Sequence, residues 1–275
     1  MKSNYIHSIR TIIGMFAVSF ILMCQNANAQ QGYPPPWMRM PPYRSVIIPV
    51  PPTPNYHQGY TTTAPASGFQ RFISFSLHFD PLISWFSTDS YNTRNDGVVP
   101  GFNLGITYNK YFSPNYSFSS GVDIIKAGGR LINSQITNFE LKDYNGSVLT
   151  VQAGEAITYR ITYLSVPLGI KLQTNQIGFG RFFTDLGFDP KIVIGGRADI
   201  PSVNIQGGNA LPELNTFNLS FHIMAGMEYP VAVNNNFIVG IGFENSLFDV
   251  TTDNGNQPSN VITQKVLSFR LGMTF

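Results

Sequence analysis

The feature that most constrains this chain is a period-two alternation of apolar and polar residues that begins after Phe69 and recurs to the C-terminus. Between residues 217 and 229 every odd position is apolar, whereas the even positions are mostly Asn, Ser, His, Gly and Glu. Successive side chains of a β-strand point to opposite faces, so the pattern predicts strands with one apolar and one polar face. The predicted strands, about eight, lie near residues 71–87, 100–112, 116–133, 156–172, 182–199, 216–229, 237–250 and 262–275.

The polarity of the two faces indicates which side of the sheet meets water. Only 12% of the residues are charged, against roughly 25% in an average soluble domain. A soluble sandwich or lipocalin-like barrel would carry a charged outer face, but here the second face is Ser, Thr, Gly and Asn, which suits a packed polar interior. No run of about 20 apolar residues follows the N-terminus, which excludes helical spans. The sequence therefore predicts an all-β fold, an eight-stranded antiparallel up-and-down transmembrane β-barrel.

The lengths of the connections predict an orientation. Connections after the second, fourth and sixth strands are short, whereas 88–99, 134–154 and 200–215 are long and rich in Asn, Asp and Gly. Outer-membrane barrels have short periplasmic turns and longer extracellular loops, so both chain ends are expected in the periplasm. The terminal Phe275 is expected to be an assembly signal for the barrel-assembly machinery.

Two segments precede the predicted barrel of residues 69–275. Residues 1–29 have a basic start and an apolar run, and end on small residues, which predicts a signal peptide cleaved between Ala29 and Gln30. Residues 30–68 are rich in proline and are expected to form a disordered or extended periplasmic arm. This arm is either a plain spacer or a docking segment for a periplasmic partner.

Charge and cysteine content narrow the possible functions. Lys2 and Arg10 are the basic residues of the signal segment, so of 17 basic and 15 acidic residues in the chain, 15 of each remain after cleavage. A neutral chain argues against nucleic acid as a partner. The single cysteine, Cys24, lies in the signal segment; lipidation there is disfavoured by the bulky Met23 before it. Without thiols or histidines at ligand spacing, we predict no metal and no cofactor.

The interior of an eight-stranded barrel is about wide enough to be filled by side chains, so an open pore is not expected. Charged residues on the predicted inward face must be paired or hydrated. We interpret them as a structural salt-bridge network that plugs the lumen, with a proton or ion pathway as the alternative. The predicted lumen charges are Asp80, Asp123, Arg160, Glu228, Glu244 and Arg270.

A hydrolase is the remote alternative to a non-enzymatic barrel. Ser76, His78 and Asp80 share one face of the first strand, as Ser220 and His222 share one face of the sixth. Residues two apart on a strand are about 6–7 Å apart, which exceeds the roughly 2.6–3.2 Å that a nucleophile and its base require. We therefore predict no catalytic residues.

Pro167 lies inside a predicted strand, where it removes a hydrogen-bond donor. The apolar positions also change there from odd numbers, such as Ile161 and Tyr163, to even numbers, such as Leu168 and Ile170. One extra residue in a β-bulge near Tyr163 to Pro167 would account for both observations.

Several segments in this order resemble the PorT family of outer-membrane β-barrel proteins of Bacteroidetes. The resemblance covers about residues 71–275 and is carried by 80–85 (DPLISW), 96–97 (DG), 101–105 (GFNLG), 115–121 (NYSFSSG), 126–131 (KAGGRL), 163–172 (YLSVPLGIKL), 225–229 (AGMEY) and 270–275 (RLGMTF). It implies an integral outer-membrane protein in contact with lipid, and a non-enzymatic accessory or structural role beside other envelope proteins in type IX protein secretion. The alternative is a free-standing structural or adhesive barrel without a secretion role.

Overall fold

The computed structural model describes residues 72–141, 148–232, 235–252 and 261–275, all within the compact unit Ala64–Phe275. The predicted signal peptide, its cleavage site at Ala29 and Gln30, and the proline-rich arm lie outside the described residues. Among the described residues, no helix has the length and apolarity needed to cross a membrane.

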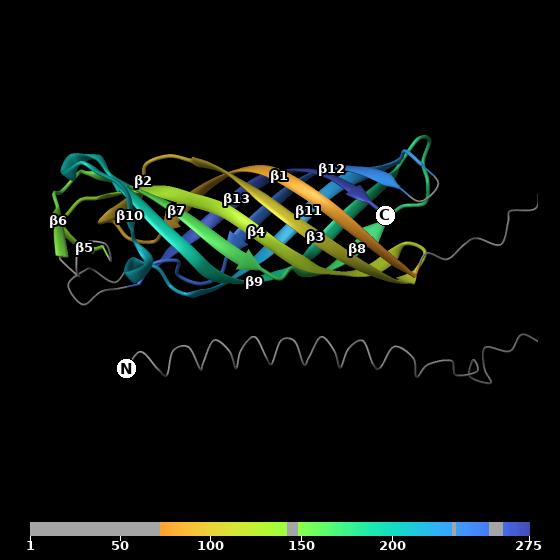
Figure 1. Cartoon of the computed structure of the whole chain (residues 1–275), viewed down its shortest axis with the longest axis horizontal. Helices are drawn as coiled ribbons and strands as arrows, with labels where there is room; N and C mark the ends of the chain where they lie inside the picture. Colours follow the sequence, from red (N-terminus) through yellow and green to blue (C-terminus); the bar gives the residue numbers. More distant parts are fainter. Residues whose placement is uncertain (1–71, 142–147, 233–234, 253–260) are drawn as a thin grey trace, which may run out of the picture. The chain divides into compact units, whose positions relative to one another are not determined.

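The described chain forms a closed ring of eight antiparallel strand positions, which confirms the predicted barrel (Figure 1). Each strand pairs with the next along the chain, and the last pairs with the first over eleven residue pairs. The ring consists of β1 (Ile73–Thr88), β3 (Val99–Ser113), β4 (Tyr116–Asn133), β7 (Ala156–Ser165) continued by β8 (Leu168–Gln173), β9 (Arg181–Ile200), β11 (Phe217–Pro230), β12 (Asn236–Ser246) and β13 (Ile262–Thr274).

The two ends of the barrel differ as the connection lengths predict. We name them the short-turn end, where the strands meet at residues 114–115, 174–180 and 231–235, and the long-loop end. Phe275 lies at the short-turn end, where its backbone pairs with that of Phe75. The long loops contain short elements that the alternation does not predict: β2 (Thr93–Asn95), β5 (Thr137–Glu140), β6 (Val148–Val151), β10 (Ile205–Asn209) and the 3-10 helices η4 (Pro201–Val203) and η5 (Leu211–Glu213). Figure 1 shows β2, β5, β6 and β10 at the end opposite the C-terminus.

Towards the short-turn end, the barrel turns its apolar side chains outward. On β1, Phe75, Leu77 and Phe79 are exposed while Ser76 and His78 are buried. Aromatic side chains contact one another on this outer face near the short turns, in the pairs Phe75–Tyr108, Phe112–Tyr116 and Phe179–Tyr229. An outward apolar band edged by aromatic residues is the exterior that a bilayer requires of a barrel.

Towards the long-loop end, the polarity of the two faces is reversed. On β4, the outward residue Ile124 is followed by the outward residue Lys126, and the inward Asp123 gives way to the inward Leu131. The same alternate positions of β4 thus face inward along its whole length. Towards the long-loop end, however, the apolar residues occupy the inward positions and the polar residues the outward ones. We infer that the barrel extends beyond the apolar band into water, where it is built like a soluble barrel.

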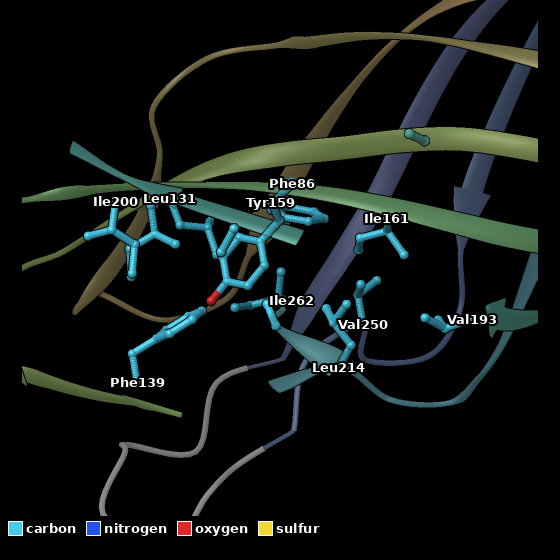
Figure 2. Packing of buried hydrophobic residues seen from close by; sticks show 14 of the residues in the cluster. Phe86, Leu131, Phe139, Tyr159, Ile161, Val193, Ile200, Leu214, Val250 and Ile262 are labelled. Carbon is cyan, nitrogen blue, oxygen red and sulfur yellow. The ribbon is translucent and has the colours of Figure 1, made fainter. Parts of the chain in front are cut away.

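The inward apolar residues at the long-loop end form a continuous core inside the barrel (Figure 2). Phe86 and Tyr159 pack edge to face with ring centroids 5.8 Å apart, and Phe139 of β5 lies 5.8 Å from the same tyrosine ring. The Phe86 ring fits because it lies against Gly129 of β4, where a Cβ atom would be 2.3 Å from the ring. Side chains of the loops, including Leu214, complete this core. We call it the apolar plug.

The prediction of a β-bulge in the strand around Pro167 is wrong. The strand does break between Ser165 and Leu168, but its pairings with β4 and β9 have the same register on both sides of the break. The register shift lies against Tyr163 and belongs to β9, where Ile194 is the extra residue. The apolar positions change parity here because the strand passes from the apolar plug into the apolar band, and its inward residues remain odd-numbered.

Candidate functional site

The lumen below the apolar plug holds a cluster of buried charged and polar side chains from β1, β3, β4 and β13. Arg270 donates from Nε and Nη2 to the carboxylate of Asp80 over 2.8 to 3.2 Å. The amide of Asn103 donates to both Asp80, at 3.3 Å, and Asp123, at 3.0 Å. Asp80 is 1% exposed, so the guanidinium provides the compensation that a buried carboxylate needs.

His78 lies between the two carboxylates of this cluster. Its Nδ1 is 3.1 Å from Asp80 and its Nε2 is 3.4 Å from Asp123. Both contacts are within ion-pair distance, but neither has the geometry of a hydrogen bond. Gly105 of β3 makes room for this arrangement, because a Cβ atom there would lie 1.9 Å from an oxygen of Asp123.

A second histidine has the same environment on the other side of the lumen. His222 of β11 places Nδ1 2.9 Å from Asp189 and Nε2 3.6 Å from Asp185, both on β9. The first set comes from β1 and β4 and the second from the paired strands β9 and β11, and in both sets one carboxylate lies against each ring nitrogen. Each imidazole is thus positioned to balance the negative charge around it.

Two lysines are buried beside these sets and pair with glutamates across the lumen. Lys171 of β8 binds Glu228 of β11, and Lys191 of β9 binds Glu244 of β12. Lys171 also lies over the Phe183 ring, 4.5 Å from its centroid, which adds a cation–π contact. These pairs bridge strands that are not adjacent, so they brace the barrel from within.

The space left between these groups is a cavity of about 60 Å³, lined by Asp80, Asp123, His222 and Arg270 among others. That volume holds a few water molecules, and the apolar plug covers it towards the long-loop end. Within the part of the chain that the structure describes, no group of three or more His, Cys, Asp or Glu residues is placed to hold a metal ion. The arrangement pairs each buried lysine and arginine with a carboxylate and braces the ring from within.

Five of the six predicted lumen charges face the lumen in the structure, and one faces outward. Asp80, Asp123, Glu228 and Arg270 are inward, and Glu244 faces the lumen with its lysine partner. The prediction is wrong for Arg160, whose side chain is 61% exposed and pairs with Asp199 on the outside. Arg160 lies beside the apolar plug, where the outer face is the polar one.

The sequence prediction missed four charged residues of the lumen. It also weighed a serine and a histidine of the first strand as a catalytic pair. Lys171, Lys191, Asp185 and Asp189 are all buried, and a consistent odd-number parity for their strands would have identified them. The serine and histidine of the first strand do not form a nucleophile and base: Ser76 shares a 2.9 Å hydrogen bond with Thr274, and His78 faces carboxylates.

A closed antiparallel ring with an outward apolar band and a filled lumen defines the class of integral β-barrel proteins. The chain belongs to the outer membrane protein beta-barrel domain family, whose sequence model matches residues 64–252. It is therefore an outer-membrane β-barrel protein. No curated protein sequence matches the chain.

Three solved structures are similar to the chain at low identity. Ail, the attachment invasion locus protein of Yersinia pestis, determined with the heparin analogue sucrose octasulfate, is 17% identical over 74% of this chain and 99% of its own, with a TM-score of 0.37. Neisserial surface protein A is 12% identical over 73% of this chain and 95% of its own, with a TM-score of 0.35. The outer-membrane protease OmpT from Escherichia coli is 7% identical over 74% and 96%, with a TM-score of 0.34.

Proposed function

We propose that the protein is a non-enzymatic, non-conducting anchor that presents the folded long-loop end to protein partners at the cell surface, with both chain ends in the periplasm. The observation that carries this proposal is the filled lumen: buried ion pairs occupy the membrane-level part, and the apolar plug closes the part beyond it. Among the described residues the space left between these two parts is a cavity of about 60 Å³, which supports a barrel that does not conduct.

The described part of the long-loop end is suited to binding because it contains strands and 3-10 helices of its own. The β5–β6 hairpin, β10 and η5 pack on or beside the apolar plug. Apolar side chains also project from this end: Tyr91 is fully exposed and Ile136 is 62% exposed. Aromatic and aliphatic side chains exposed on a surface are typical of protein-binding sites.

The resemblance to the PorT family favours a partner within the type IX secretion machinery, with the protein as an accessory or structural component. Deletion of the gene, followed by quantitative comparison of the secreted proteins, tests this role. Loss of many exported proteins, restored by the wild-type chain, is the expected result. An unchanged secreted proteome would overturn the secretion role and favour a free-standing structural or adhesive barrel.

Complementation with surface variants locates the partner site. A Tyr91→Ser/Ile136→Ser chain is expected to insert normally but to restore secretion poorly. The matched control, Val231→Ser/Ile177→Ser, alters two exposed apolar residues at the short-turn end and is expected to restore it fully. Equal rescue by both would place the partner surface elsewhere than the long-loop end.

A further inference from the structure

The outer surface of β4, β7 and β9 changes from apolar to basic at the edge of the apolar band. Ile124, Leu164 and Ile192 are outward and lie side by side in register across the three strands. Four residue pairs further towards the long-loop end, Arg160 and Arg197 are paired directly and are also outward. Apolar and basic rows are thus stacked on one continuous patch of the barrel wall.

Four cations gather on this patch, and two of them are held by carboxylates. Arg160 is 2.7 Å from Asp199, and Arg130 is 2.8 Å from Asp96. The remaining two are Lys126, which lies 5.4 Å from the centroid of the Phe102 ring, and Arg197, which is exposed. Among the described residues, neither of these two has an acid within ion-pair distance. The patch therefore carries surplus positive charge.

We propose that Lys126, Arg160 and Arg197 form a binding site for the phosphate headgroup of an anionic lipid in the leaflet at the long-loop end. Arginine presents a planar fork of N–H donors that matches phosphate oxygens, and Asp199 fixes the Arg160 guanidinium in place. The acyl chains of the same lipid lie along the apolar row of Ile124, Leu164 and Ile192. This inference depends on membrane insertion of the barrel and is independent of the proposed surface function.

Continuity with the apolar band distinguishes a lipid from a soluble anion or an acidic protein. Lys126 lies two residues beyond Ile124, about 6–7 Å along the strand, and Arg160 lies four residues beyond Leu164, about 13 Å. The strands of such a barrel are tilted by about 35–45° and an arginine side chain is long, so one lipid can span the apolar row and these cations. Basic residues at such a boundary attract anionic lipids. The loss of each one is expected to weaken lipid binding about fivefold. A soluble anion would use the cations alone and gain nothing from the apolar row below.

The test uses the full-length protein in detergent micelles doped with dioleoyl phosphatidic acid or dioleoyl phosphatidylcholine, with bound lipid counted by native mass spectrometry. Wild type is expected to retain phosphatidic acid in preference to phosphatidylcholine. Arg160→Gln/Arg197→Gln is expected to weaken phosphatidic acid binding by about tenfold or more. Arg160→Lys/Arg197→Lys, which retains the charge, is expected to recover most of the binding.

A matched control removes two outward cations elsewhere, Lys110 of β3 and Lys265 of β13, as Lys110→Gln/Lys265→Gln; wild-type binding is expected. Inorganic phosphate at 10 mM is expected to leave bound phosphatidic acid in place. Equal losses in the two glutamine variants, equal retention of both lipids, or full displacement by inorganic phosphate would each overturn the proposal.

Discussion

The stability lost when the ion pair between Asp80 and Arg270 is broken measures how far water is excluded from the lumen. Asp80 is 1% exposed and receives N–H donors from Arg270 on the far side of the β1–β13 seam, where the ring closes. Asp80→Asn leaves the guanidinium without its main counter-charge, and breaking a buried pair in this way costs about 3–5 kcal/mol. Arg270→Met is expected to cost less, because Asp80 keeps its contacts with His78 and Asn103.

The assay is reversible urea unfolding of the refolded barrel in detergent micelles, followed by the fluorescence of Trp85 on β1. The double variant is expected to be more stable than the sum of the two single losses predicts, with a coupling energy of about 2–3 kcal/mol. A control pair, Arg130→Met and Asp96→Asn, breaks an ion pair on the exposed outer face and is expected to cost about 0–1 kcal/mol. If Asp80→Asn and Arg270→Met each change stability by less than about 0.5 kcal/mol, the lumen is hydrated and the bracing argument fails.

Three further predictions follow from the filled lumen. Phe86→Ala is expected to lose about 3–5 kcal/mol in the same unfolding assay, because it empties the centre of the apolar plug; a loss below about 1 kcal/mol would show that the plug is loosely packed. Gly129→Ala is expected to destabilise the barrel by about 1–3 kcal/mol, since its Cβ atom would overlap the Phe86 ring, and the Phe86→Ala/Gly129→Ala double variant should recover part of that loss. Planar bilayers containing the purified protein are expected to show no steady single-channel conductance, and porin-like steps would contradict a closed lumen.

The strand pattern was predictable because the barrel obeys one strong rule, period-two alternation, along almost its whole length. The predicted strand near residues 116–133 coincides with β4, and the one near 262–275 differs from β13 by one residue. The short elements of the long loops were not predictable in this way. Residues of β5 and β10 gain their order from packing on or beside the apolar plug, which the local sequence does not reveal.

The lumen could be predicted only in part, because alternation identifies a face and not its environment. Leu168 and Ile161 are both apolar, yet one faces outward and the other lies inside the plug. Alternation alone therefore predicts a shift of register at Pro167 and an inward Arg160, and both predictions are wrong. Partners such as Lys171 and Glu228 are 57 residues apart, and no single-strand pattern contains the cross-lumen distance that joins them.

The central claim is that the apolar face points outward at membrane level and inward at the long-loop end. Single cysteines at Ile106, Thr107, Arg160 and Ile161, labelled with bimane and reconstituted in vesicles of brominated phosphatidylcholine, test it directly. We expect strong quenching by brominated chains at position 106 alone. We expect rapid reaction of the unlabelled cysteine with a water-soluble maleimide at position 160 alone, and neither result at positions 107 and 161. Lipid quenching at position 161, or its absence at position 106, would contradict the reversal of polarity and the membrane placement built on it.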